Sequence, residues 1–261
     1  MQYSNAYIFG FAAAICVVCG VVVAGSAVTL KDRQEANARL DRQKKVLSVV
    51  GLLKEDEDLD APAIEARFAE RIHPVVVDLK TGKPAEGIDA ATFDQQAEAK
   101  DPAIGMDAPA NQAKVLRLPK HAIVYEVLGT DKKVERVVLP VEGKGLWSTL
   151  YGYLAVEKDG DTIAGLTFYQ HGETPGLGGE IDNPRWKSLW PGRKIHNAKG
   201  ENAIRVVKGA AGAVSEAPNK VDGLSGATLT SNGVTYLLQF WVGEHGFGPY
   251  LAGMTGAKQG G

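Results

Sequence analysis

The clearest feature of the hydrophobic pattern is an uninterrupted apolar run near the N-terminus. Residues 6–28, AYIFGFAAAICVVCGVVVAGSAV, contain no charged side chain. A helix of about 20 apolar residues can cross the hydrocarbon core of a bilayer, so the run predicts one transmembrane helix that anchors the protein. The alternative is a cleaved signal peptide ending in AGSA, but the preceding residues, MQYSN, lack the basic charges typical of one.

A second helical pattern follows the apolar run directly. In residues 31–53, apolar side chains recur every three or four positions between charged ones, at Ala36, Leu40, Leu47 and Val50. This spacing is typical of a helix with one apolar face. We expect the helix to leave the membrane and dock on the soluble part of the chain.

Alternating patterns in the second half of the chain predict antiparallel strands. Residues 122–128 and 133–140 flank a Gly-Thr-Asp turn, and residues 151–171 repeat this layout around an Asp-Gly-Asp turn. Further strand candidates are residues 75–79 and 203–207. We therefore expect an α+β fold: a single N-terminal transmembrane helix, then a soluble domain with a twisted, mainly antiparallel sheet packed by helices.

Charge and cysteine content exclude some classes of function. The 261-residue chain has a formal net charge of -2, so no global positive field attracts nucleic acid, and we expect none to bind. The two cysteines, Cys16 and Cys19, both lie in the apolar run, where thiols behave as small hydrophobic groups. The rest of the chain has no disulfide or thiolate metal site, and we predict no metal site.

The stretch DGLSGATLTS, from Asp222 to Ser231, combines four hydroxyl side chains with a Gly-Ala pair. A helix is expected to begin near residues 229–230, because apolar residues then follow at helical spacing, namely Val234, Leu237, Leu238 and Trp241. The free N–H groups of its first turn suit a phosphate. Ordinary helix capping explains one Ser or Thr, but neither the full set of hydroxyls nor the glycine.

A glycine-rich loop is the second candidate site. HGETPGLGGEI, residues 171–181, follows a strand and holds four glycines beside a carboxylate and a hydroxyl. Such loops let backbone N–H groups approach a planar or anionic ligand closely. The same composition also occurs in plain connections, so composition alone leaves both interpretations open.

Together these motifs resemble a known family. DGLSGATLTS resembles the Ser/Thr-Gly-Ala-Thr flavinylation motif of bacterial redox pumps, whose closing threonine carries FMN through a phosphoester bond; here that residue is Thr228. The loop HGETPGLGG and the stretch GLWSTLYGY, residues 145–153, resemble further signatures in the same order. Over most of residues 1–250 the chain is similar to the C subunits of the Na+-translocating NADH:quinone oxidoreductases.

The resemblance implies how the attachment motif works. In the family an external flavin transferase moves FMN from FAD onto the threonine, so Thr228 would be a substrate of that enzyme and the chain needs no catalytic residue of its own. The small residues Gly226 and Ala227, next to Ser225, would leave room for the transferase and the phosphate. Asp222 would serve transferase recognition, or simply form an Asp-Gly turn.

The resemblance also implies which residues surround the flavin ring. The glycine-rich loop would run along the ring, with Thr174 and backbone N–H groups donating hydrogen bonds to its polar edge. Trp147 would stack on the ring or border it. Lys208 would place positive charge near the anionic reduced flavin, although a solvated lysine at a strand end fits equally well. The expected set is Glu173, Thr174, Gly176, Leu177, Gly178, Trp147 and Lys208.

The resemblance divides the chain into four regions. These are a transmembrane anchor at 1–30, a helical linker and mixed α/β region at 31–120, an FMN-binding domain at 121–250 and a flexible tail at 251–261.

The function implied is that of a covalently flavinylated electron-transfer subunit. It would relay single electrons inside a membrane complex that couples NADH oxidation and ubiquinone reduction to Na+ export. The chain has no dinucleotide-binding fingerprint and one span, so NADH oxidation, quinone reduction and ion conduction would belong to partner subunits. Two alternatives remain: the flavin subunit (G) of the Rnf ferredoxin:NAD+ complex, and a membrane-tethered scaffold without a cofactor.

Two arguments about membrane orientation conflict. The family carries its flavin domain on the periplasmic side of the bacterial inner membrane, and we adopt this expectation. The positive-inside rule predicts the opposite side. The basic residues close to the span all follow it, namely Lys31, Arg33, Arg39, Arg42, Lys44 and Lys45.

Overall fold

The computed structural model describes residues 4–54 and 57–256. It forms two compact units, one comprising the chain up to Arg42 and the other beginning at Gln43. Helix α1, Asn5–Val49, is continuous over 45 residues, so its last turns belong to the second unit.

The apolar part of α1 matches the expected membrane anchor. Among the described residues, α1 is the one helix long and apolar enough to cross a membrane. The most apolar 18-residue window has a mean hydropathy of 2.6, and none of it is buried inside the protein. Cys16 and Cys19 lie exposed on this helix. An apolar surface of this length without protein packed on it is suited to lipid.

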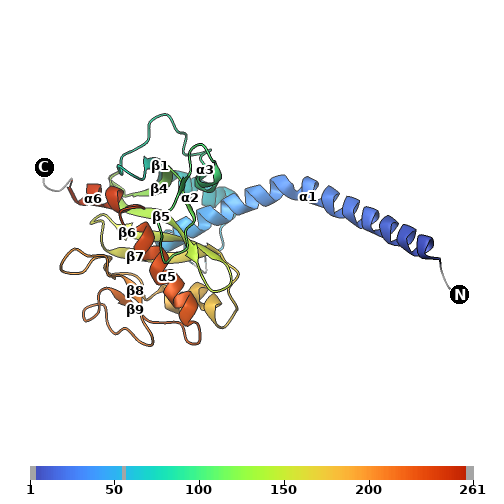
Figure 1. Cartoon of the computed structure of the whole chain (residues 1–261). Coiled ribbons are helices and arrows are strands. Elements are labelled where there is room, and N and C mark those ends of the chain that lie inside the picture. Colours follow the sequence, from blue (N-terminus) through green and yellow to red (C-terminus); the bar gives the residue numbers. More distant parts are fainter. Residues whose placement is uncertain (1–3, 55–56, 257–261) are drawn as a thin grey trace. The chain divides into compact units, whose positions relative to one another are not determined.

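The second unit is built on a five-stranded sheet in the order β1-β4-β5-β6-β7 (Figure 1). All neighbouring strands in it pair antiparallel, which confirms the expected fold class and both hairpins. A separate two-stranded ladder joins β2, Met106–Asp107, to β3, Arg117–Leu118. The strands of the main sheet are β1 Ile72–Asp78, β4 His121–Leu128, β5 Val134–Lys144, β6 Thr149–Glu157 and β7 Ile163–Gln170.

Helix α5, Thr228–Trp241, covers one face of this sheet and packs closest to β5 (Figure 1). The four apolar residues that the spacing predicted are all buried in the core. Two glycines permit the close approach: a Cβ on Gly143 would lie 2.5 Å from the Leu237 Cβ, and one on Gly233 would lie 2.4 Å from the Lys144 carbonyl oxygen. The sheet therefore holds the N-terminal half of α5 beside the turn between β5 and β6.

The last turn of α1 and the residue that follows it pack inside the second unit, as expected. Val46, Leu47 and Val50 are buried there, and a Cβ on Gly165 of β7 would lie 2.4 Å from the Val49 carbonyl oxygen. Ala36, which the spacing also placed on the apolar face, is exposed.

Shorter helices complete the described chain. Asp60 caps the N-terminus of α2 and accepts a hydrogen bond from the Ala63 N–H at 3.0 Å. Helix α6 reaches Gly256, and the remainder of the expected flexible tail, residues 257–261, lies outside the described residues. The shorter helices are α2 Ala61–Arg71, α3 Gln95–Lys100, a 3-10 helix at Gly178–Asp182, α4 Pro184–Lys187 and α6 Gly248–Gly256.

Two local expectations differ from the structure. The strand expected at 203–207 shortens to β8, Arg205–Val206, which pairs parallel with β9, Lys220–Val221, outside the main sheet. The N–H groups of Ala203 and Ile204 instead donate to the Ile195 carbonyl oxygen at 2.9 and 3.1 Å, and the Val206 N–H donates to the Thr235 hydroxyl on α5 at 2.9 Å. Helix α5 also begins slightly earlier than expected, at Thr228.

Candidate functional site

Three segments far apart in the sequence meet at the N-terminus of α5. They are the β5–β6 turn at residues 145–148, the glycine-rich loop after β7 at 171–178, and the turn at 222–227 that leads into α5. The hydrogen bonds and close contacts given below join all three. The structure thus brings together the three motifs that the sequence singled out.

One buried carboxylate holds these segments together. Glu173 is 5% exposed and accepts four hydrogen bonds. Its Oε1 accepts from the N–H groups of Trp147 at 2.9 Å and Ser148 at 3.2 Å, and its Oε2 accepts from the Leu146 N–H at 3.2 Å. The Thr230 hydroxyl on α5 donates to Oε2 at 2.6 Å. We call Glu173, residues 146–148 and Thr230 the Glu173 cluster.

The Glu173 cluster keeps its carboxylate ionised. Burial alone would raise the pKa of Glu173, but hydrogen bonds from the Thr230 hydroxyl and from three backbone N–H groups together hold that pKa below its ordinary value. Within the described residues no cation pairs with this carboxylate. Its charge is therefore stabilised by hydrogen-bond donors alone.

Glycines let the loop fit against this cluster. A Cβ on Gly178 would lie 2.5 Å from the Thr230 Oγ1 and 2.7 Å from the Glu173 Oε2, so no larger residue fits without displacing one of them. Gly226 has φ +72, and a Cβ there would lie 3.0 Å from the Leu177 Cδ2. The glycine-rich loop thus contacts both α5 and the turn that precedes it.

The four hydroxyls of DGLSGATLTS fall into two pairs. Thr230 and Ser231 are buried: Thr230 donates to Glu173, and the Ser231 Oγ accepts from the Leu224 N–H at 3.1 Å. Ser225 and Thr228 are exposed, and their hydroxyls make no hydrogen bond within the described residues. One pair therefore builds the turn, while the other faces outward.

Thr228 occupies the first position of α5. Ala227 stands at the N-cap and offers no side-chain acceptor. Within residues 4–54 and 57–256, no acceptor binds the N–H groups of Thr228, Leu229 and Thr230. An uncapped helix N-terminus carries partial positive charge and suits a phosphate group.

Large apolar side chains are exposed on the elements that meet at this helix N-terminus. Trp147 is 67% exposed and Leu229 is 61% exposed, beside the exposed Leu146 and Leu177. We call these four residues the apolar rim. Leu146 and Trp147 lie on the β5–β6 turn, Leu177 on the glycine-rich loop and Leu229 in the first turn of α5. Exposed apolar side chains on segments that meet are typical of a binding surface.

The other residues expected in the site have different surroundings. Thr174 is exposed. Of the backbone N–H groups expected to donate to the flavin, that of Leu177 already donates to the Thr174 carbonyl oxygen at 3.1 Å. The N–H groups of Gly176 and Gly178 have no acceptor among the described residues. The Asp222 carboxylate accepts from the Ala211 N–H at 2.8 Å and so stabilises the loop after β8. Lys208 is exposed in that loop and makes no hydrogen bond or ion pair with any described residue.

Sequence reasoning missed three contributors to this arrangement. Thr230 was noticed only as one hydroxyl of the motif. The Ser148 Oγ accepts from the Gly172 N–H at 2.6 Å, and the Lys144 Nζ donates to the Trp147 carbonyl oxygen at 3.1 Å. No local signal in the sequence identifies these contacts, because each joins residues whose proximity depends on the fold or on a particular turn.

His171 is oriented away from the Glu173 carboxylate. Its Nδ1 accepts from the Glu173 backbone N–H at 3.2 Å, so the proton lies on Nε2, which donates to the Asp182 Oδ2 at 2.7 Å. The ring therefore stabilises the loop and the 3-10 helix that follows it.

Comparison with known proteins agrees with this site. The family model of the FMN-binding domain matches residues 145–243, a range that includes all three segments. The fold and the site thus define a protein with an FMN-binding domain that follows an apolar N-terminal helix.

Relatives over nearly the full length specify the family. The C subunit of the Na(+)-translocating NADH-quinone reductase from Vibrio vulnificus is 46% identical over 245 residues, which cover 93% of this chain and 92% of the relative. The corresponding protein from Pseudomonas aeruginosa is 45% identical over 243 residues, covering 92% of each chain. The chain therefore belongs to the family of C subunits of the Na+-translocating NADH-quinone reductases.

A solved structure supports the same conclusion. The crystal structure of NqrC from Shewanella oneidensis matches with a TM-score of 0.77 and 35% identity, covering 85% of this chain and 99% of that one. The predicted resemblance and fold class are thereby confirmed.

Proposed function

We propose that this chain carries FMN covalently on Thr228 and relays single electrons within a Na+-translocating NADH:quinone reductase. As a member of the C-subunit family, it is one subunit of an oxidoreductase complex and contains an FMN-binding domain. The names of the relatives favour this complex over the Rnf alternative, and the FMN-binding domain favours a flavoprotein over a scaffold without a cofactor.

The exposed Thr228 hydroxyl is the observation that carries the proposal. It stands on the first turn of α5, beside free N–H groups and positive helix-dipole charge that would receive a phosphate. Thr230 and Ser231, the neighbouring hydroxyls, are buried and engaged. Among the four hydroxyls, only Thr228 combines exposure with a place at the helix N-terminus.

Attachment needs a transferase as a second protein. The Thr228 oxygen forms a bond to the phosphorus of the FMN half of FAD, the bond between the two phosphates breaks, and AMP leaves. The hydroxyl proton passes to the transferase or to solvent. The exposed Ser225, Gly226 and Thr228 give such an enzyme access to this turn.

The residues around Thr228 fit a flavin. The apolar rim would contact the isoalloxazine ring, and the free N–H groups of Gly176 and Gly178 would donate to its polar edge. When bound, FMN supplies a carrier that takes up and releases electrons one at a time. The covalent bond would keep it in place between turnovers.

The remaining roles would lie in other subunits. Residues 4–54 and 57–256 contain one helix apolar enough to span a membrane, and the sequence has no dinucleotide motif, so we assign NADH oxidation, quinone reduction and Na+ conduction to partner chains. We place the soluble domain on the periplasmic side of the bacterial inner membrane, on the strength of the resemblance. Lys208 would act on the flavin only if a partner or the cofactor itself approaches it.

A gel experiment tests the attachment. The full chain is expressed with a flavin transferase, denatured, separated on a gel and viewed under ultraviolet light. We expect a fluorescent band that Thr228→Ala abolishes. Ser225→Ala is the matched comparison, because it removes the other exposed hydroxyl of the turn, and it should retain a fluorescent band. Fluorescence that persists in Thr228→Ala would contradict the proposal.

A further inference from the structure

We propose that Glu173 is a positioning residue, which fixes the first turn of α5 so that the Thr228 hydroxyl is correctly presented for flavin attachment. This inference rests on the proposed function. It assigns to Glu173 a role different from the flavin contact that the resemblance implied. The buried carboxylate would act through its hydrogen bonds, without touching the flavin.

The contacts run directly from Glu173 to the attachment turn. Thr230 lies two residues after Thr228 in the same helical turn, and its hydroxyl donates to the Glu173 Oε2 at 2.6 Å. Because Thr230 is completely buried, its hydroxyl has no water to replace this partner. Loss of the bond would allow the first turn of α5 to shift or fray.

The same carboxylate also fixes the turn between β5 and β6. Its three remaining bonds hold the backbone of Leu146, Trp147 and Ser148, and thereby one side of the apolar rim. Gly178 permits this arrangement, since a Cβ there would lie 2.5 Å from the Thr230 Oγ1 and 2.7 Å from the Glu173 Oε2. Glu173 therefore joins the β5–β6 turn, which carries Leu146 and Trp147, to the first turn of α5.

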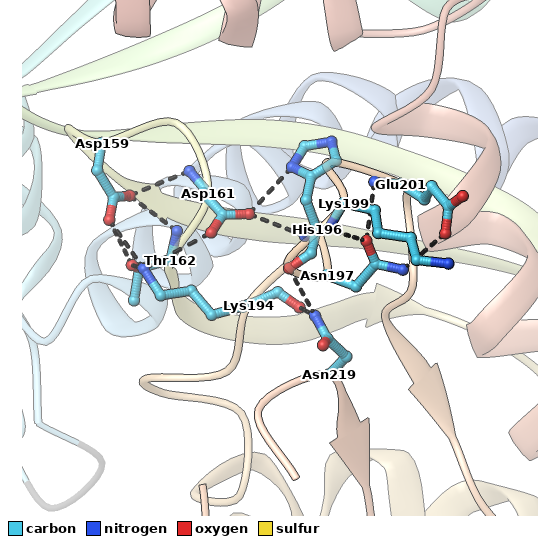
Figure 2. A network of polar contacts seen from close by, with 9 residues as sticks. All are labelled: Asp159, Asp161, Thr162, Lys194, His196, Asn197, Lys199, Glu201 and Asn219. Carbon is cyan, nitrogen blue, oxygen red and sulfur yellow. Dashed lines mark hydrogen bonds and ion pairs between the residues drawn. The ribbon is translucent and has the colours of Figure 1, made fainter. Parts of the chain in front are cut away.

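A second carboxylate provides a matched control. Asp159, in the turn between β6 and β7, also accepts four hydrogen bonds (Figure 2). The donors are the N–H groups of Asp161 at 3.0 Å and Thr162 at 2.8 Å, the Thr162 hydroxyl at 2.5 Å and the Lys194 Nζ at 3.2 Å. We call these residues, with His196, the Asp159 cluster. None of its bonds reaches α5 or the three segments of the candidate site.

The test measures flavin attachment to the full-length protein. Chain expressed without transferase is purified in detergent and incubated with a flavin transferase and FAD, and attachment rates are measured over a range of protein concentrations. The variants are Glu173→Gln, Thr230→Val, the double variant, the conservative Thr230→Ser and the control Asp159→Asn. Circular dichroism and thermal unfolding establish that each is folded.

We expect Glu173→Gln and Thr230→Val each to lower the maximal rate roughly tenfold or more, because small displacements of a reacting group are costly. The concentration of protein at half-maximal rate should change far less. The double variant should lose less than the sum of the two single losses, since both substitutions disrupt the same Thr230–Glu173 hydrogen bond. Thr230→Ser keeps the hydroxyl and should therefore attach flavin at about the wild-type rate. Asp159→Asn should also match the wild-type rate.

The outcomes separate the two proposals. Wild-type protein that takes up no flavin at Thr228 would defeat the proposed function. Wild-type labelling with an unimpaired Glu173→Gln, or an equal loss in Asp159→Asn, would overturn the positioning role alone. If Glu173→Gln does not fold, Thr230→Val decides, because it removes only the hydroxyl and nearly preserves the side-chain shape.

Discussion

The Glu173 and Asp159 carboxylates each accept four hydrogen bonds, but they differ in burial, in charge partners and in where their donors lie along the chain. Glu173 is 5% exposed and has no cation partner in the described residues, whereas the Asp159 side chain is 35% exposed and pairs with Lys194. Three of the four donors to Asp159 lie within three residues of it, while the donors to Glu173 lie at least 25 residues away in sequence. The Asp159 carboxylate is bonded mainly within its own turn, whereas the Glu173 carboxylate joins only segments that are distant in sequence.

This difference in the position of the donors shows which part of the candidate site depends on the overall fold. The Asp159 cluster secures the β6–β7 turn to the segment around Lys194 and His196, where Asp161 accepts from the His196 Nδ1 at 3.0 Å (Figure 2). Water can reach its donors if the carboxylate is removed. The Thr230 hydroxyl in the Glu173 cluster is completely buried and has no such substitute, so we expect changes there to cost more.

The largest effect should come from removing each carboxylate. Glu173→Ala leaves three backbone N–H groups and the Thr230 hydroxyl without their acceptor, which should lower the free energy of unfolding by about 3 kcal/mol. Asp159→Ala should cost clearly less. Urea unfolding of the purified protein measures both changes. Equal losses would remove the contrast between the clusters.

A smaller loss of stability is expected when a substitution crowds the Glu173 cluster but leaves its carboxylate in place. An alanine at Gly178 would place its Cβ against Thr230 and Glu173, with an expected cost of about 1–3 kcal/mol. Gly172→Ala is the matched control in the same loop, because its Cβ would lie at an ordinary 3.4 Å from the Ser148 Cβ. Thermal unfolding compares them. A Gly178→Ala variant as stable as Gly172→Ala would show that the cluster is loosely packed.

The sequence predicted the local parts of this contrast and missed the distant ones. Sequence patterns predicted the Asp-Gly-Asp turn at 159–161 and the helix that contains Val234 to Trp241, because the determinants of each lie within a few residues. The contact between Glu173 and Thr230 spans 57 residues, and no local pattern encodes it. Resemblance placed Glu173 in the site, but only the fold gives it a structural partner on α5.

The smallest effect concerns pH. Hydrogen bonds overcome the effect of burial and lower the pKa values of both Glu173 and Asp159, that of Asp159 more strongly. Each carboxylate therefore adds stability above its ordinary pKa of 4.5 or 3.8, which is lost as the pH falls through its native pKa. The difference in melting temperature between wild type and Glu173→Gln should shrink below about pH 4.5, and that of Asp159→Asn only at lower pH. Differences constant from pH 7 to pH 3 would contradict this linkage.

Mass spectrometry of the mature protein tests the central claim most directly. Trypsin should release the peptide from Val221 to Lys258, which contains both exposed hydroxyls of the motif, Ser225 and Thr228. In protein isolated from native membranes, we predict that this peptide carries the mass of one phosphoester-linked FMN, and that fragmentation assigns it to Thr228. Recovery of the peptide without flavin, or with flavin on Ser225, would contradict the account.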